Sequence, residues 1–258
     1  MKVVGIIPAR LESTRLPRKL LLSDTGHPLI WHTWERAQQA RSLKDVIVAT
    51  DSEEIAGVVR GFGGRCELTG DHPSGTDRIA EVVRRLEIAP DIIVNIQGDE
   101  PEIDPASIDA VVETLVNTET ARMATLATPI RELADVQNPS CTKVARARDG
   151  RALYFSRAPI PCVRDQDPSA VLRLESPWLL HVGIYAYQRE FLLKLTTLPP
   201  SRLERFEKLE QLRALEAGAT IQVRIVDRHS VGIDTPDDYA RFVERALSSA
   251  GSAVRNAG

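Results

Sequence analysis

The sequence predicts an α/β protein with a mostly parallel central sheet, and two observations carry that prediction. Short β-branched runs alternate with longer amphipathic stretches through the first half of the 258 residues, which is the signature of βαβ units. One of these runs, at 91–96, holds a continuous apolar stretch, as expected of a central strand that is buried on both faces.

The first half supplies four strands with helices between them. We expect strands at 3–7, 45–50, 65–68 and 91–96, and helices at 30–41, 53–62 and 76–86. The second of these helices has clear end signals. Asp51 and Ser52 supply its N-cap, and the acids of its first turn suit the positive end of the helix dipole. Gly63-Gly64 then ends it.

The second half is less regular. We expect helices at 103–116, at 201–217 and from Thr235 onward, and strands at 123–129, 142–146, 152–155, 179–187 and 221–226, with a polar loop at 161–176. The helix at 201–217 rests on leucine or phenylalanine at every third position from 203 to 215. We expect a single domain over 1–258, with an inserted substrate or dimerisation lobe at about 150–190 and a flexible tail at about 249–258.

Composition excludes several classes of protein. The chain has 33 Lys and Arg against 36 Asp and Glu, a net charge of −3, whereas a nonspecific nucleic-acid binder needs a basic surplus. No stretch approaches the roughly 18 apolar residues of a membrane span, and the first ten residues lack a signal peptide's apolar segment. Cys66, Cys141 and Cys162 are too irregularly spaced for a disulfide framework or a zinc site. We therefore expect a cytoplasmic protein with reduced thiols and no nucleic-acid partner.

A basic loop follows the first predicted strand directly. Four cations and two hydroxyls crowd into residues 10–19: Arg10, Ser13, Thr14, Arg15, Arg18 and Lys19. Open α/β sheets place ligands at the carboxyl ends of their strands, and Arg and Lys bind phosphate oxygens. A polyphosphate is the natural ligand, with a merely solvated loop as the alternative. Pro8 and Pro17 favour binding, because a solvated loop has no need of stiffening.

Two carboxylates follow apolar stretches in the same way. Asp99 comes after the strand at 91–96, and Asp234 lies where a short apolar run meets the start of the last helix. Mg²⁺ prefers one or two carboxylates together with phosphate oxygens and water, so both residues are candidate Mg²⁺ ligands. The alternative is that each simply caps a turn or helix.

Two further groups could contact a small molecule. The loop at 71–78 runs into a helix N-terminus, whose free N–H groups suit a base or a phosphate. In the second half, His181 and Tyr185 are four apart on a predicted strand and project from the same face. Arg157 follows another predicted strand, and Glu210-Gln211 lie in the predicted helix at 201–217. Together with His181 and Tyr185, these residues could line a site for a hydroxylated acid. Each could also be structural.

Taken together, these segments closely resemble the 3-deoxy-manno-octulosonate cytidylyltransferases, the CMP-Kdo synthetases of lipopolysaccharide assembly. The matching segments span nearly the whole chain, at 7–10, 13–17, 49–51, 74–78, 95–101, 153–157, 181–185, 209–213 and 232–236. The resemblance implies the nucleotide-diphospho-sugar transferase fold, which is Rossmann-like, and a homodimer. One departure stands out: the family usually reads Pro-Gly-Lys-Pro where this chain has Pro17-Arg18-Lys19-Leu20.

The resemblance also implies a role for each candidate residue. It assigns the CTP phosphates to Arg10, Arg15 and Lys19, and the rest of the nucleotide to Ser74, Gly75 and Arg78. It assigns Mg²⁺ to Asp99 and Asp234, which with Lys19 and Arg10 form the catalytic set. It assigns the sugar-acid site to Gln97, Arg157, His181, Tyr185, Glu210 and Gln211.

The implied reaction transfers CMP from CTP to the anomeric hydroxyl of 3-deoxy-D-manno-octulosonate (Kdo), giving CMP-Kdo and pyrophosphate. One alternative is a cytidylyltransferase for another ulosonic acid, either 8-amino-Kdo or a sialic-type acid. A second alternative, from a different class, is a nucleotide-binding regulator without catalysis.

Overall fold

The computed structural model describes residues 1–228 and 230–255, which group into two compact units. The first unit comprises 4–88, 95–105 and 230–255, and the second unit comprises 1–3, 89–94 and 106–228. The predicted lobe at about 150–190 is therefore part of a larger compact unit. The prediction of one domain with that lobe inserted stays a prediction.

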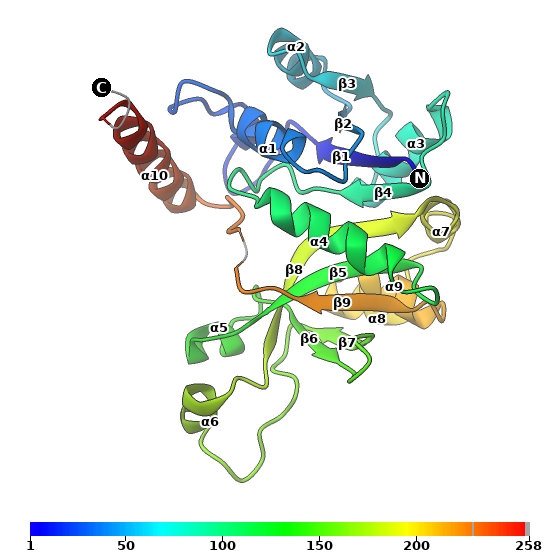
Figure 1. The fold of residues 1–258 in the computed structure, drawn as a ribbon, viewed down its shortest axis with the longest axis vertical. Coiled ribbons are helices and arrows are strands. Elements are labelled where there is room, and N and C mark those ends of the chain that lie inside the picture. Colours follow the sequence, from blue (N-terminus) through cyan, green and yellow to red (C-terminus); the bar gives the residue numbers. More distant parts are fainter. Residues whose placement is uncertain (229, 256–258) are drawn as a thin grey trace. The chain divides into compact units, whose positions relative to one another are not determined.

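The first unit is built on parallel strands (Figure 1). Its elements are β1 (Val3–Ala9), η1 (Lys19–Leu21), α1 (Leu29–Gln38), β2 (Asp45–Thr50), α2 (Glu53–Gly61), β3 (Arg65–Leu68), α3 (Gly75–Arg85) and α10 (Pro236–Arg255). β2 lies between β1 and β3 and is parallel to both, with Val4 opposite Asp45 and Ile47 opposite Arg65. Helices α1, α2 and α3 all contact β2. The predicted βαβ arrangement is confirmed.

The second unit carries a mixed sheet. Its elements are β4 (Ile92–Asn95), α4 (Pro105–Val116), β5 (Met123–Pro129), α5 (Leu133–Gln137), β6 (Lys143–Arg146), β7 (Ala152–Ser156), α6 (Pro168–Leu174), β8 (Leu179–Gln188), α7 (Arg189–Leu195), α8 (Arg202–Glu207), α9 (Gln211–Glu216) and β9 (Ile221–Ile225). β5 pairs in parallel with β9 and antiparallel with β8, which also pairs with β6. All predicted strands are present, and the α/β class is confirmed.

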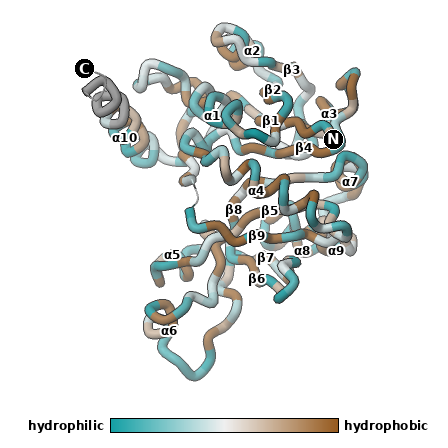
Figure 2. Tube along the Cα trace, in the orientation of Figure 1, coloured by the Kyte–Doolittle hydropathy of each residue, from teal (hydrophilic) through white to brown (hydrophobic). Residues whose placement is uncertain are grey.

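The predicted loop at 161–176 contains a short helix, α6, that the sequence did not indicate. Asp167 caps it by accepting a hydrogen bond from Ser169 N, and Pro168 occupies its first turn. The residues before it are hydrophilic (Figure 2). Trp178, 2% exposed, packs with Ile130 and Val136 beneath this segment and donates from Nε1 to Pro161 O at 2.8 Å. A small satellite core therefore orders the loop.

The single helix predicted at 201–217 is wrong. α8 ends at Glu207, its C-cap Lys208 has a left-handed φ of 54°, and α9 begins at Gln211. The apolar stripe repeats every three residues, so each position turns about 60° backward on a 3.6-residue helix, and five positions span about 240°. One straight helix could not bury them all. The break buries Leu209 and Leu212 and leaves Phe206 75% exposed.

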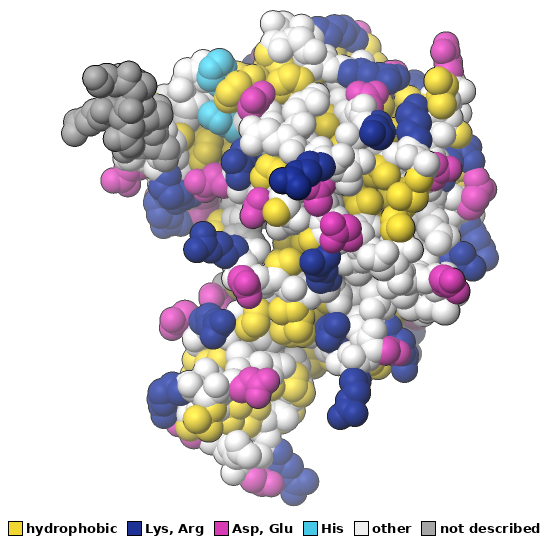
Figure 3. Space-filling view, in the orientation of Figure 1, with side chains coloured by type: hydrophobic (Ala, Val, Ile, Leu, Met, Phe, Trp, Pro, Cys, Tyr) yellow, Lys and Arg dark blue, Asp and Glu magenta, His cyan; other side chains and the backbone are white. Residues whose placement is uncertain are grey.

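Helix α10 begins at Pro236, as predicted, and its backbone is helical through Arg255. The flexible tail at about 249–258 stays a prediction, and its last three residues lie outside the described part of the chain. Among the described residues, no helix combines the length and apolarity needed to cross a bilayer. Cations and carboxylates are interspersed over the face in Figure 3, in keeping with the near-neutral total.

Candidate active site

An open cleft of about 1070 Å³ lies at the carboxyl ends of the strands of the first unit. Its walls come from the loop after β1 (8–15), the turn after β2 (51–52), the loop after β3 (71–75) and the segment after β4 (97–99). This is the edge at which open α/β sheets bind ligands. The cleft includes nine predicted site residues: Arg10, Arg15, Lys19, Ser74, Gly75, Arg78, Gln97, Asp99 and Asp234.

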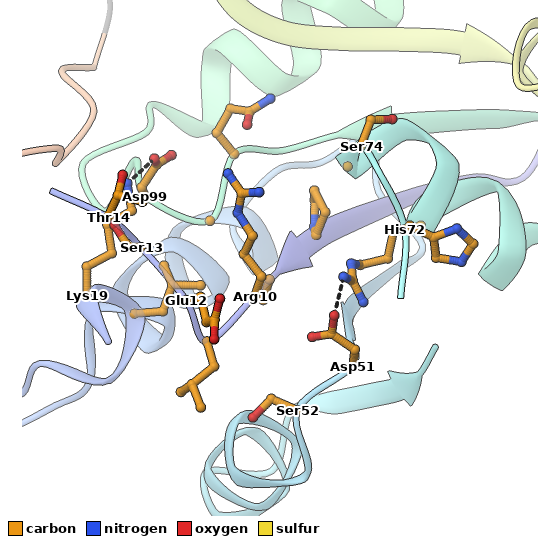
Figure 4. Close-up of a pocket in the computed structure, with 18 of the residues that line it drawn as sticks. Arg10, Glu12, Ser13, Thr14, Lys19, Asp51, Ser52, His72, Ser74 and Asp99 are labelled. Atoms are coloured by element: carbon orange, nitrogen blue, oxygen red, sulfur yellow. Dashed lines mark hydrogen bonds and ion pairs between the residues drawn. The ribbon is translucent and has the colours of Figure 1, made fainter. Parts of the chain in front are cut away.

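Lys19 joins the two candidate metal carboxylates. Its Nζ donates to Asp99 Oδ2 at 2.6 Å, to Asp234 Oδ1 at 3.1 Å and to the Ile233 carbonyl at 2.8 Å. Asp99 and Lys19 face each other in Figure 4. Three oxygens thus converge on one cation, and an all-oxygen donor set of this kind fits Mg²⁺. Within the described residues, no group of three or more His, Cys, Asp or Glu forms a larger metal cluster.

Asp234 does not cap the last helix, which was the alternative reading of this residue. The capping bonds of α10 belong to its neighbours, because Thr235 Oγ1 accepts from Asp238 N at 3.2 Å and Asp238 Oδ2 accepts from Thr235 N at 2.9 Å. The Asp234 carboxylate instead pairs with Lys19 and, at 2.9 Å, with Arg15. Its side chain is therefore directed toward cations of the cleft.

The segment after β4 reaches the cleft by passing close to β1. Ile96 N donates to Ile6 O at 3.1 Å, and a Cβ on Gly98 would lie 3.3 Å from the carbonyl oxygen of Pro8. Thr33 Oγ1 holds the turn by donating to Gly98 O at 3.0 Å. Glycine at 98 therefore permits the close approach that brings Asp99 beside the basic loop.

Arg18, where the family usually has glycine, adopts a left-handed conformation with φ 56° and ψ 27°. This region favours glycine because a Cβ is crowded there. Arg18 forms the turn that starts η1. Its guanidinium pairs with Glu54 and not with Asp99 or Asp234, the carboxylates that contact Lys19. Arg18 therefore adopts, as a non-glycine residue, a backbone conformation that suits glycine, and Lys19 follows it directly as the first residue of η1.

Arg10 stands at the end of β1 and is exposed. In Figure 4 its side chain extends into the space between the Asp99 segment and the loop that carries His72 and Ser74. No ion pair of Arg10 occurs within the described part of the chain. Its guanidinium is thus available to an anionic ligand.

The wall at the start of α3 is built from capping and buried charge. Ser74 caps α3 by accepting from Asp77 N at 3.1 Å, and a Cβ on Gly75 would lie 3.2 Å from Pro8 Cγ. Arg78 is 4% exposed and donates to Asp51 Oδ2 at 2.6 Å and to Gly70 O at 3.3 Å. The resemblance assigns Arg78 to the nucleotide, but its hydrogen bonds to Asp51 and Gly70 hold the cleft wall together.

His181 and Tyr185 lie side by side in the second unit, with ring centroids 5.3 Å apart. Four residues of a regular strand span about 13 Å, so spacing alone does not explain the contact. β8 is irregular here: Tyr185 pairs with Thr125 while Val182 pairs with Leu126, leaving two residues between them. This bulge draws the two rings together on the face that the sequence predicted.

Burial shifts the titration of both residues. It lowers the pKa of His181 to about 3 and raises the pKa of Tyr185 well above its ordinary value, with Tyr187 and Glu210 adding to the latter. His181 Nε2 lies 3.1 Å from Thr125 Oγ1. His181 is therefore a neutral hydrogen-bonding group at neutral pH, and Glu210 is near enough to Tyr185 to influence it.

Glu210 and Gln211 lie at the start of α9, not inside one long helix. Gln211 is 7% exposed, and its buried Nε2 has no hydrogen-bond partner among the residues that the structure describes. Because an unmade bond from a buried amide is costly, this donor is suited to a ligand.

Arg157 holds the chain just before this segment. Its Nε donates to Glu207 O at 2.7 Å and its Nη1 donates to Pro139 O at 2.9 Å. Its predicted contact with the sugar acid stays a prediction.

Two acids with long-range contacts, the half-buried Glu207 and the buried Glu100, were missed from the sequence. Glu207 accepts from Ser156 Oγ at 2.6 Å and from Arg157 N at 2.9 Å, and so joins α8 to the end of β7. Glu100, next to Asp99, pairs with Ser230, and burial raises its pKa to about 7. Neither partner is near in sequence, so only the fold reveals these contacts.

The chain is similar in sequence to known proteins along almost its whole length. A family model described as cytidylyltransferase matches residues 4–222. A 3-deoxy-manno-octulosonate cytidylyltransferase from Geobacter sulfurreducens is 47% identical over 254 residues, covering 95% of this chain and 99% of that protein. Its namesake from Syntrophobacter fumaroxidans is 51% identical over 245 residues, covering 94% and 96%.

A solved structure provides a similar match. It is the structure of a CMP:2-keto-3-deoxy-manno-octonic acid synthetase complexed with CTP, whose sequence is 39% identical to this chain. The two structures superimpose with a TM-score of 0.89, and the match covers 96% of this chain and 100% of that one. The nucleotide-diphospho-sugar transferase fold is thereby confirmed. On these matches the chain belongs to the cytidylyltransferase family, among the 3-deoxy-manno-octulosonate cytidylyltransferases.

Proposed function

We propose that the protein transfers CMP from CTP to the anomeric hydroxyl of Kdo and releases pyrophosphate, as a step of lipopolysaccharide synthesis. The observation that carries the proposal is the cleft at the strand ends, where Lys19 lies between Asp99 and Asp234 in a chain of this family. A triphosphate and a metal ion need this combination of adjacent cations and carboxylates.

The basic loop would bind the triphosphate. Arg10 reaches into the cleft, and Arg15 and Lys19 line the same wall. Arginine can bind two phosphate oxygens at once, and lysine adds a mobile point charge. Ser74 and Gly75 would let the nucleotide pass close to the start of α3, since Gly75 leaves no side chain beside Pro8.

Asp99 and Asp234 would hold Mg²⁺, together with phosphate oxygens and water. When bound, the metal would neutralise phosphate charge and make the attacking hydroxyl more acidic. The protein residues would supply position and charge: Arg10 and Lys19 would hold the phosphates in line for attack and stabilise the leaving pyrophosphate. Placement and electrostatics of this kind account for most catalysis of phosphoryl transfer.

The sugar acid would be recognised by the polar group of the second unit. The role that the resemblance assigns to Gln97, which lines the cleft, stays a prediction. Thr125 Oγ1 has one proton, and carbonyls of Ile184 and Val182 lie 2.8 and 3.0 Å away to take it. The hydroxyl then accepts from His181 Nε2–H, which leaves Nδ1 as an acceptor for a sugar hydroxyl. Tyr185, Glu210 and Gln211 would offer further donors and acceptors, with Arg157 as a supporting contact.

We also propose that the enzyme is a cytoplasmic homodimer, on the strength of the family resemblance. Sedimentation equilibrium of the full chain tests the dimer. A single species at twice the 28.5 kDa chain mass is expected, and a monomer at micromolar concentration would contradict it.

A pyrophosphate-release assay tests the proposed reaction. It uses CTP, Mg²⁺ and Kdo, with UTP, 8-amino-Kdo, a sialic acid and metal-free buffer as separate arms. We expect release only with CTP, Mg²⁺ and Kdo. Release with the other acids instead would select the alternative substrate, and nucleotide binding without release would select the non-catalytic regulator.

The same assay tests the metal ligands. Asp99→Asn should lose most turnover, because it removes a carboxylate at nearly constant volume. Asp45→Asn is the matched control, since Asp45 lies at the opposite end of β2 and pairs with Arg65. Asp99→Asn activity close to that of the control would overturn the metal assignment.

A further inference from the structure

Two of the cations assigned to the nucleotide, Lys19 and Arg15, are paired with the carboxylates assigned to the metal. Lys19 Nζ contacts Asp99 at 2.6 Å and Asp234 at 3.1 Å, and Arg15 contacts Asp234 at 2.9 Å. Two positive groups thus neutralise two negative groups before any ligand arrives. The site is internally balanced, with an ammonium where the carboxylates converge.

The ion pairs of Lys19 are stronger than the ion pair of Arg15 with Asp234. Its side chain is 14% exposed, whereas that of Arg15 is 62% exposed, and buried pairs are screened by salt much less than exposed ones. A third oxygen, the carbonyl of Ile233, also accepts from Nζ at 2.8 Å. The ammonium therefore lies among three oxygens that could also serve as ligands of a small cation.

The backbone around Lys19 is fixed while its ammonium can move. Lys19 opens η1, whose next residue, Leu20, is anchored at 5% exposed. The four-carbon stem of lysine carries its charge through several rotatable bonds. Nζ can therefore leave the carboxylates for a nearby anion without any rearrangement of the chain.

We propose that Lys19 occupies the metal position in the nucleotide-free protein and thereby makes metal binding depend on the triphosphate. The inference rests on the proposed function. A divalent cation must displace Nζ to reach Asp99 and Asp234, and a triphosphate lowers that cost by offering Nζ another anion. Because linkage is reciprocal, bound metal frees Lys19 and favours the triphosphate to the same extent.

Mn²⁺ binding to the nucleotide-free protein, followed by electron paramagnetic resonance, tests the proposal without measuring turnover. Lys19→Met should bind Mn²⁺ at least tenfold more tightly than the wild type, because the competing ammonium is gone. Arg18→Met is the matched control: it removes a cation one residue away that pairs with Glu54, and its Mn²⁺ affinity should stay within twofold of wild type.

Two measurements keep the result interpretable. Circular dichroism checks that Lys19→Met is folded, and Lys19→Gln, which keeps a hydrogen-bond donor but no charge, should show the same gain if Lys19→Met does not fold. Mn²⁺ affinity that is unchanged or weaker in the folded variants would overturn the proposal.

Equilibrium dialysis with CTP separates this proposal from the proposed function. Wild-type protein should retain Mn²⁺ when CTP is present, and Asp99→Asn should not. If the wild type retains Mn²⁺ with CTP but Lys19→Met gains no affinity without it, only the role of Lys19 is wrong. If the wild type retains none with CTP, the metal site itself is wrong, and both proposals fall.

Discussion

Arg78 and Asp51 form an ion pair of 2.6 Å that joins the first turns of α3 to the carboxyl end of β2. The Arg78 side chain is 5% exposed and that of Asp51 is 30% exposed. The pair forms one wall of the cleft, and the dashed line at Asp51 in Figure 4 marks this contact. A residue that the resemblance assigns to the nucleotide therefore also holds the site together.

We predict that Arg78→Met lowers the free energy of unfolding by about 2 kcal/mol, because it removes the charged hydrogen bonds that the buried guanidinium makes to Asp51 and to Gly70 O. Urea denaturation measures this change. Arg85→Met on the same helix is the control: Arg85 is 46% exposed in its pair with Glu81, and its loss should cost at most about 1 kcal/mol. Equal losses for the two variants would show that Arg78 is not a structural support.

Arg18→Gly should leave stability unchanged or raise it by up to about 1 kcal/mol. The left-handed conformation of Arg18 costs a non-glycine residue about 1–2 kcal/mol, part of which glycine offsets by its greater freedom in the unfolded chain. The exposed pair with Glu54 contributes little. Thermal and urea unfolding check this, and a loss of more than about 1 kcal/mol contradicts the account of this turn.

His181 should make the protein less stable in acid. Burial holds its pKa at about 3, below the ordinary 6.5, so between these values the unfolded chain takes up a proton that the folded chain does not. Stability then rises with pH by up to about 1.4 kcal/mol per unit across this window. Unfolding measured from pH 4.5 to 6.5 should show a shallower slope for His181→Gln, and parallel slopes would refute the assignment.

Gln211→Met should separate stability from substrate binding. Removing a buried donor that lacks a partner should leave the free energy of unfolding unchanged or raise it by about 1 kcal/mol. The KM for Kdo should rise, because the donor assigned to the sugar acid is lost. Gln222→Met, which removes an amide already bonded to Asp149 O at 2.8 Å, should not change KM. A destabilised Gln211→Met with unchanged KM would make Gln211 structural.

The sequence predicts local elements of this fold closely, because their signals are local. β2 and β3 have the predicted bounds, 45–50 and 65–68, and Ser52 caps α2 as expected. The break at Lys208 was missed because leucine at every third position imitates a helical face while rotating around it. The short helix α6 was missed because the core that orders its loop is assembled from residues far apart in the chain.

The candidate site divides in the same way. Residues at strand ends, such as Arg10 and Asp99, are predicted from position alone, because parallel strands bring their carboxyl ends to one edge. Contacts between distant residues are not predictable in this way. The sequence gives no sign that Lys19 would meet Asp234, more than two hundred residues later, or that a bulge would bring His181 against Tyr185.

Phosphorus NMR of the reaction mixture most directly tests whether CMP is transferred to Kdo. With CTP, Mg²⁺ and Kdo, the CTP signals should be replaced by one phosphodiester and one pyrophosphate in equal amounts, and mass spectrometry should identify the phosphodiester as CMP-Kdo. Unchanged CTP, or pyrophosphate formed together with free CMP and no sugar conjugate, would contradict the proposed function.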